Sequence, residues 1–209
     1  MGLITRKPAV LVLEDGSVFE GFSLGKIGVA TGEICYNTGM TGYQEIYTDP
    51  SYFGQIIINT SSHIGNYGTV EDEQESSSPQ ISGVIINEYS EIYSRSNSDE
   101  SLEDYFIKNN TVAIYDIDTR KLVKYIRDKG AMNAIISSES QDVEKLKSSL
   151  DKVPSMKNLE LSSKVTTEKE YEFGDKNSKI KIAVLDLGCK QSILKNFSER
   201  GCALQSFPC

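Results

Sequence analysis

The stretch from residue 37 to residue 69, NTGMTGYQEIYTDPSYFGQIIINTSSHIGNYGT, constrains the fold more than any other part of the chain. It places turn-forming residues on both sides of one apolar segment, residues 55–60. Asp49-Pro50 fixes a turn, because proline presets its own φ and excludes the preceding residue from the helical region. Such a stretch is costly to order and adds little core. It therefore indicates either a functional loop system or a well-capped surface loop system, and composition favours neither.

Composition bounds the class of protein. The chain has 209 residues, enough for one large domain or one and a half ordinary ones. Its hydrophobic content of 38% is sufficient for a core, and 22 basic against 30 acidic residues give a net charge of −8. Because an acidic chain repels phosphate backbones, we expect no nucleic-acid partner.

Cysteine usage and the N-terminus predict the compartment. Cys35, Cys189, Cys202 and Cys209 form no C-x-x-C pair, which argues against a zinc or redox motif, and they are too few for a disulfide scaffold. The first apolar run, residues 9–13, is too short for a signal peptide or a membrane span. We therefore expect a soluble cytoplasmic protein with no membrane contact, no metal and no cofactor in this chain.

The first half of the chain predicts mainly strands. Residues 9–13 and 18–22 flank Asp15-Gly16, a dipeptide typical of hairpin turns. Further strands are expected at 28–37, 55–60 and 81–87. Between the last two, residues 70–80 form a polar, acidic loop.

Helices and strands then alternate. The expected elements are a helix at 99–108, a strand at 112–115, a helix at 118–129, a strand at 134–137 and a helix near 143–150. The first helix should stop at Asn109-Asn110. Asp118 should cap the second helix and Gly130 should end it. Ser138 and Gln141 could form a capping box for the third.

Composition shifts again after residue 150. Residues 151–178 are polar, charged and nearly aperiodic, which predicts a linker after an N-terminal domain at 1–150. Residues 179–187 then form an apolar strand, Gly188 turns the chain, and residues 191–200 form a helix before a strand at 203–207. We expect Ile193, Leu194 and Phe197 to point inward. This is the first βαβ unit of a parallel sheet, and since one unit cannot bury both faces of its strands, we expect residues 179–209 to be the truncated start of a second domain.

Two residues are candidates for nucleophilic chemistry, and for both a structural role is favoured. Cys189 follows a strand at a sharp turn before a helix, where thiol pKa values can fall. However, LGCKQ lacks the second glycine of a G-x-nucleophile-x-G elbow. The only histidine, His63, lies in the other predicted domain, among polar loop residues. No catalytic residue is therefore assigned.

The segment DIDTRKL, residues 116–122, is a third candidate. Acids, a hydroxyl and basic residues meet there at a strand-to-helix turn. A ligand or partner contact at the helix N-terminus is possible on this pattern. A local role is favoured, in which Asp118 caps the helix and Arg120 pairs with an acid. No dinucleotide fingerprint or P-loop occurs in the sequence.

At this point the sequence resembles the small, glutamine-hydrolysing subunit of carbamoyl phosphate synthetase. The resemblance is carried, in order, by AVLVLEDGSVFEGFSLG, TGEICYNTGMTGYQEIYTDPSYFGQ, HIGNYG, AIYDIDTRKLVKYIRDKGA and KIAVLDLGCKQSILKNFSERGC. The combination of TGYQE, TDPSY and DIDTRKL is specific. The resemblance implies an α/β fold, with an N-terminal β/β/α swivelling-type domain followed by the first βαβ unit of a flavodoxin-like class I glutamine amidotransferase domain.

The resemblance also implies a function. In this family glutamine is hydrolysed through a cysteine thioester, and ammonia passes to a large synthetase subunit. That subunit uses ATP and bicarbonate to make carbamoyl phosphate for pyrimidine or arginine synthesis. The family's nucleophile elbow, its later histidine and glutamate, and its glycine-rich glutamine loop all have no counterpart in these 209 residues, so we expect the chain to be inactive alone.

One glutamine contact of the family does fall on this sequence. It is the serine of the DPSY motif, here Ser51, which would form part of the wall of the glutamine pocket in the complete subunit. Its alternative role is that of a turn residue after Pro50. Two functions stay open: part of a glutaminase subunit, or a non-catalytic binding module that docks on the large subunit.

Overall fold

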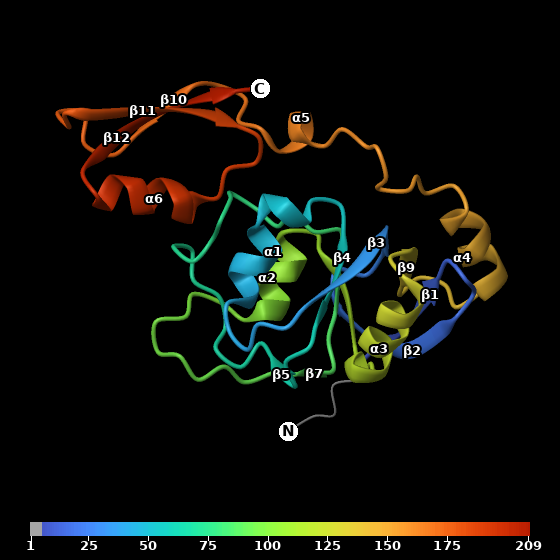
Figure 1. Ribbon diagram of the computed structural model, residues 1–209. Coiled ribbons are helices and arrows are strands. Elements are labelled where there is room, and N and C mark those ends of the chain that lie inside the picture. Colours follow the sequence, from blue (N-terminus) through green and yellow to red (C-terminus); the bar gives the residue numbers. More distant parts are fainter. Residues whose placement is uncertain (1–5) are drawn as a thin grey trace.

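The protein is described by a computed structural model that covers residues 6–209 and shows a mixed α/β architecture (Figure 1). Its main sheet is a closed barrel with the strand order β1-β2-β8-β6-β4-β3-β9. The strands are β1 (Pro8–Leu13), β2 (Val18–Gly25), β3 (Val29–Asn37), β4 (Ile56–Asn59), β6 (Gly83–Ile85), β8 (Val112–Tyr115) and β9 (Asn133–Ser137).

The barrel combines antiparallel and parallel pairs. β1 and β2 form the predicted hairpin, in which the Gly16 amide donates to the Leu13 carbonyl at 2.8 Å. The pairs β3–β4, β4–β6 and β6–β8 are parallel. β9 pairs antiparallel with both β1 and β3, and this closes the barrel. A closed sheet leaves no exposed barrel edge to pair with another chain.

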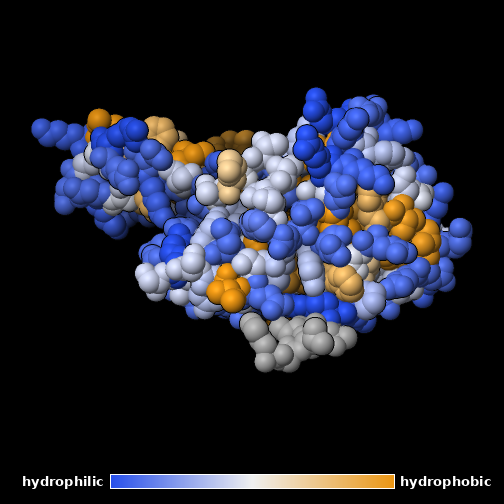
Figure 2. Space-filling model, turned by 90° about the horizontal axis from the view of Figure 1, so that it is seen from below, coloured by the Kyte–Doolittle hydropathy of each residue, from blue (hydrophilic) through white to orange (hydrophobic). Residues whose placement is uncertain are grey.

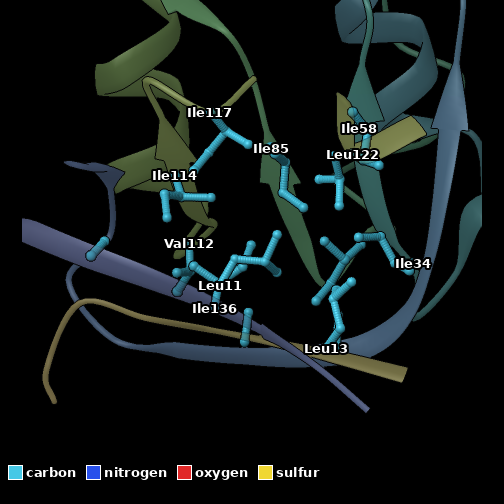
Figure 3. Packing of buried hydrophobic residues seen from close by; sticks show 14 of the residues in the cluster. Leu11, Leu13, Ile34, Ile58, Ile85, Val112, Ile114, Ile117, Leu122 and Ile136 are labelled. Carbon is cyan, nitrogen blue, oxygen red and sulfur yellow. The ribbon is translucent and has the colours of Figure 1, made fainter. Parts of the chain in front are cut away.

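The barrel interior is filled mainly by alternate residues of its strands, whereas β2 contributes only the partly buried Phe19 (Figure 3). In β1, Leu11 and Leu13 point into the barrel, whereas Val12 packs outside with Leu146 and Leu150 of α4 (Val143–Leu150). This follows from the two-residue period of a strand, and it explains why β1 is apolar at nearly every position. The helix α3 (Thr119–Lys129) adds two apolar side chains to the interior cluster and so covers an opening of the barrel.

A second apolar layer lies outside strands β4, β6 and β8. It is built around α1 (Tyr43–Thr48) and α2 (Leu102–Lys108), and Phe106 of α2 packs against Tyr47 of α1 with ring centroids 5.4 Å apart. The α1 helix was not predicted from the sequence. It has only 6 residues and follows the N-cap residue Gly42, whose φ of 79° lies in the left-handed region. Its apolar contacts are tertiary, so a short window of sequence carries little helical signal.

Most of the predicted helix ends are confirmed. α2 stops at Asn109, Asp118 accepts a hydrogen bond from the Lys121 amide, and Gly130 ends α3 with φ 98°. The proposed Ser138–Gln141 capping box is wrong. Asp142 caps α4 instead, and the Ser138 hydroxyl accepts a hydrogen bond from the Gly28 amide.

The C-terminal segment forms a separate three-stranded sheet in the order β10-β12-β11 (Figure 1). β11 (Ile180–Asp186) and β12 (Cys202–Pro208) are parallel and joined by α6 (Gln191–Glu199), as the predicted βαβ unit requires. The stretch predicted to be a linker holds two short elements, α5 (Ser162–Val165) and β10 (Tyr171–Phe173). β10 pairs antiparallel with β12, so it extends this sheet rather than only joining two domains.

The helix α6 is less buried than predicted. Only Leu194 is enclosed, whereas Ile193 and Phe197 are 42% and 41% exposed. The sheet beneath α6 has only three strands, and within β11 only Asp186 is buried. Figure 2 shows this part of the molecule as a smaller lobe with apolar side chains on its surface. Leu185 and Leu187, at the end of β11 and in the turn after it, are among its exposed side chains.

Two further short strands complete the fold. β5 (His63–Ile64) and β7 (Glu88–Tyr89) form a two-stranded parallel sheet beside the barrel. No helix within residues 6–209 combines the length and the apolar character that a membrane span needs.

Candidate functional site

The Ser51 turn lies directly after α1, in the 3-10 helix η1 (Pro50–Tyr52). One oxygen of the Asp49 carboxylate, Oδ1, accepts a hydrogen bond from the Ser51 amide at 2.8 Å. Pro50 occupies the first helical position, where its missing N–H costs nothing. Ser51 itself is exposed. The local sequence therefore holds the Ser51 backbone in one direction and leaves its side chain accessible.

A second ordered turn joins β11 to α6. The Asp186 side chain is buried, and its Oδ1 accepts hydrogen bonds from the amides of Gly188 at 2.9 Å and Cys189 at 2.7 Å. Its Oδ2 accepts from the Thr167 amide at 2.9 Å. Gly188 has a φ of 98°, a conformation that side chains with a Cβ rarely adopt. Asp186 thus fixes both the turn and the segment that precedes β10.

The two turns meet. The Lys190 ammonium lies 3.4 Å from Asp49 Oδ2, so one carboxylate connects the Ser51 amide to the C-terminal lobe. Gly188 faces the same place: a Cβ on it would lie 3.1 Å from Pro50 Cβ and 2.8 Å from Val165 Cγ2. Together these contacts set the Ser51 turn against the β11–α6 turn. We call this region the junction, defined by residues 48–51, 75–80 and 186–192.

The acidic loop predicted at residues 70–80 supplies the third side of the junction. The Glu75 carbonyl accepts from the Gln191 amide at 3.0 Å, and its carboxylate accepts from the Ser192 amide at 2.9 Å. A cavity of about 690 Å³ opens here, and its lining includes Pro50, Glu75, Gln80, Thr166, Asp186 and Cys189. The junction is therefore held together by polar contacts, and it also contains a cavity.

Cys189 lines the cavity but is not activated. Burial raises the pKa of its thiol, and the nearby carboxylates of Asp186 and Glu75 raise it further. A raised pKa keeps the thiol protonated near neutral pH, whereas a nucleophile needs the thiolate. His63 lies in β5, where its Nδ1 is 3.2 Å from a carboxylate oxygen of Glu88, whereas Cys189 lies in the turn between β11 and α6 of the C-terminal lobe. The structure thus does not bring the two candidates together.

The DIDTRKL segment, residues 116–122, agrees with the prediction at Asp118 but not at Arg120. Asp118 caps α3 at 2.9 Å, as expected. The expected ion pair of Arg120 is wrong: within residues 6–209 no acidic oxygen lies within bridging distance of its guanidinium. Arg120 instead lines a cavity of about 580 Å³ with Lys124, Arg127 and Thr38. In the part of the chain that the structure describes, no group of three or more metal-ligating side chains is placed to hold an ion.

Sequence reasoning missed two residues of the junction. Asp186 ends a strand immediately before a turn glycine, a position that could have marked it as a turn-fixing residue. Glu75 gave no comparable signal, because it is one of several acids in a polar loop. Its role depends on a contact with a residue 117 positions later in the chain.

The fold and the junction define a class of mixed α/β protein in which a closed barrel is joined through polar turns to a βαβ unit. Comparison with known proteins identifies the family of the chain. The family model described as "Carbamoyl-phosphate synthase small chain, CPSase domain" matches residues 11–136, most of the barrel. The chain belongs to this family.

Relatives named carbamoyl phosphate synthase small chain match nearly the whole chain. The protein from Synechococcus sp. is 40% identical over 220 residues, which cover 100% of this chain and 56% of the relative. The protein from Chlorobaculum tepidum is 43% identical over 195 residues, covering 93% and 53%. That from Aquifex aeolicus is 41% identical over 215 residues, covering 97% and 58%. The chain thus spans little more than half the length of these relatives.

Proposed function

We propose that this chain is part of the glutamine-hydrolysing subunit of carbamoyl phosphate synthetase. In the complete subunit, glutamine would be hydrolysed and the ammonia passed to a large synthetase subunit, which makes carbamoyl phosphate from bicarbonate and ATP. The family membership supports the subunit identity. The β11–α6–β12 unit would be the start of a flavodoxin-like amidotransferase domain.

The observation that carries the proposal for Ser51 is the contact between the two turns. Asp49 holds the Ser51 amide on one side and approaches Lys190 of the C-terminal lobe on the other. A residue of the barrel domain can contribute to a glutamine site in the other domain only if its turn is held against that domain. Among residues 6–209 the Ser51 hydroxyl has no hydrogen-bond partner, which leaves it free for a ligand.

The test uses the complete subunit together with the large subunit. One neutral hydrogen bond contributes about 0.5–1.5 kcal/mol, so Ser51→Ala should raise the glutamine KM roughly two- to tenfold. Synthesis with ammonia in place of glutamine should be unchanged. Ser148→Ala is the matched control, since Ser148 lies on α4 and bonds only to its own helix, at Glu144. Equal losses with glutamine and ammonia would contradict the assignment of Ser51 to a glutamine site.

We further propose that the 209-residue chain has no glutaminase activity of its own. The motivating observations are the protonated state favoured for Cys189 and the absence of a second histidine in the sequence. Glutamate release is measured at saturating glutamine with the purified chain. Turnover that disappears in a Cys189→Ser variant would overturn this proposal and make Cys189 the nucleophile.

A non-catalytic docking module is the second candidate function. It is favoured by a row of exposed basic side chains on α3, Arg120, Lys124 and Arg127, which stands out on a chain with a net charge of −8. If docking on the large subunit is the main role, the 209-residue chain should bind that subunit without any other segment. Binding that is insensitive to charge reversal of Lys124 and Arg127 would remove this support.

A further inference from the structure

We infer that Glu75 is a positioning residue that fixes the α6 helix, and with it the C-terminal lobe, against the turn that carries Ser51. The inference rests on the proposed function for its consequence in catalysis, but its structural part is independent of that function. Glu75 would not touch glutamine. It would act through the geometry of the junction.

The first step concerns what the α6 helix lacks. The opening amides of a helix have no partner within the helix and need an acceptor from outside it. Lys190 occupies the N-cap position of α6, and its side chain makes no capping hydrogen bond. Lysine has no acceptor atom, so the local sequence cannot cap this helix by the usual means.

The second step concerns what replaces the missing cap. Glu75 provides two acceptors, its carbonyl for the Gln191 amide and its carboxylate for the Ser192 amide, at 3.0 and 2.9 Å. A carboxylate at this end of a helix also interacts favourably with the positive end of the helix dipole. The α6 helix is therefore capped by a residue of the other lobe, 117 positions earlier in the chain.

The third step concerns how Glu75 is itself held. Its amide donates to the hydroxyl of Thr48, a fully buried residue at the end of α1, at 2.8 Å. The Ser76 hydroxyl donates to the Thr48 carbonyl at 2.6 Å. The capping residue is thus anchored on the same helix end from which the Asp49–Ser51 turn leaves.

These contacts close a ring. From Thr48 it runs through Glu75 to α6, then through Lys190 to Asp49, which follows Thr48 directly. The Ser51 amide is bound to Asp49 and so belongs to the ring. Removing the Glu75 carboxylate opens the ring on one side. The C-terminal lobe would then keep the Lys190 contact, the Glu75 carbonyl contact, the hydrogen bond from Lys195 Nζ to the Asp72 carbonyl and the packing of Gly188 on Pro50.

Hydrogen exchange at single amides of the 209-residue chain tests the structural part. In Glu75→Ala, exchange of the Ser192 amide should accelerate roughly tenfold, as expected for loss of a helix cap. Gln191, which bonds to the backbone carbonyl of Glu75, should change less. Glu75→Gln keeps an oxygen acceptor and should restore most of the protection. Glu71→Ala is the control, since it removes another acid of the same loop, one whose backbone bonds to Asp99 and Gln74 rather than to α6.

The Cys189 thiol gives an independent readout. In a Cys209→Ser background, the Cys189 thiol should react faster with a thiol reagent at pH 8 when Glu75→Ala is added. The substitution removes a negative charge near the thiol and loosens the turn. Glu71→Ala should not increase this rate. Should Glu75→Ala fail to fold, the test uses Glu75→Gln, in which exchange of the Ser192 amide should accelerate to a smaller extent. Exchange at Ser192 that is equal in the Glu75 and Glu71 variants would overturn the inference.

The catalytic consequence is tested in the complete subunit with the large subunit. Glu75→Ala should raise the glutamine KM several-fold, with kcat for ammonia-dependent synthesis unchanged and with partial rescue by Glu75→Gln. If Glu75→Ala alters exchange of the Ser192 amide but leaves the glutamine KM unchanged, Glu75 caps α6 but has no role in glutamine use. If Ser51→Ala also has no effect, the proposed glutamine site itself is rejected.

Discussion

The Asp49 carboxylate makes two separable contacts, and substitution can take them apart. Its Oδ1 accepts the Ser51 amide and its Oδ2 faces the Lys190 ammonium. Asp49→Ala removes both contacts. Asp49→Asn keeps a side-chain oxygen for the Ser51 amide but removes the charge that attracts Lys190. The pair of variants therefore separates a local cap from a contact between the lobes.

The expected magnitudes follow from the geometry. Loss of an aspartate cap costs about 0.5–2 kcal/mol. The ion pair spans 3.4 Å, with the Lys190 side chain 37% exposed, so it contributes about 0.2–1 kcal/mol. Asp49→Ala should therefore lower the free energy of unfolding by about 1–3 kcal/mol and Asp49→Asn by less than about 1 kcal/mol. For a chain of this size, each 1 kcal/mol corresponds to roughly 2–4 °C in Tm.

The assay is urea unfolding of Asp49→Ala, Asp49→Asn, Lys190→Gln and the Asp49→Asn, Lys190→Gln double variant. The coupling free energy from the cycle of the last three variants isolates the ion pair. It should be a few tenths of a kcal/mol or more at low salt and should shrink in 1 M salt, where the Debye length falls to about 3 Å. If Asp49→Asn lowers the free energy of unfolding as much as Asp49→Ala, the hydrogen bond to the Ser51 amide contributes no measurable stability, and the reasoning fails.

Three further predictions concern reactivity, the turn and the core. Because burial and carboxylates raise its pKa, Cys189 should be alkylated more slowly than the exposed Cys209 at pH 8, and its rate should still climb above pH 9, as followed by mass spectrometry. Gly188→Ala should lower Tm more than Gly201→Ala, because both have positive φ but only Gly188 has close neighbours. Leu122→Ala, in the barrel interior, should cost about 2–5 kcal/mol in urea unfolding; a loss below about 1 kcal/mol would contradict the core assignment.

Local chemistry in the sequence determined much of the fold. Asp15-Gly16 specified the first hairpin, and Asp118 and Gly130 marked the two ends of α3. The apolar strand, glycine turn and helix after residue 179 predicted a parallel βαβ unit, which β11, α6 and β12 form. These features depend on contacts between residues close in sequence, or on the regular spacing of apolar residues along one helix or strand. A short window of sequence is therefore enough to predict them.

Only the tertiary structure decided how those elements combine. The closing of the barrel through β9, and the burial of α1 against Phe106, depend on pairings between distant segments. The exposure of Ile193 was misjudged because helical spacing predicts a face but cannot say how wide the sheet beneath it is.

The candidate site divides in the same way. Pro50 and Asp49 allowed the Ser51 turn to be predicted, because the turn is stabilised within three residues. Its contact with Lys190 and the capping of α6 by Glu75 could not be predicted, since each joins residues more than 100 positions apart. The sequence by itself determined which turn presents Ser51. The tertiary structure decided what that turn is held against, because only the folded chain brings an acceptor from one lobe to the unpaired amides of the other.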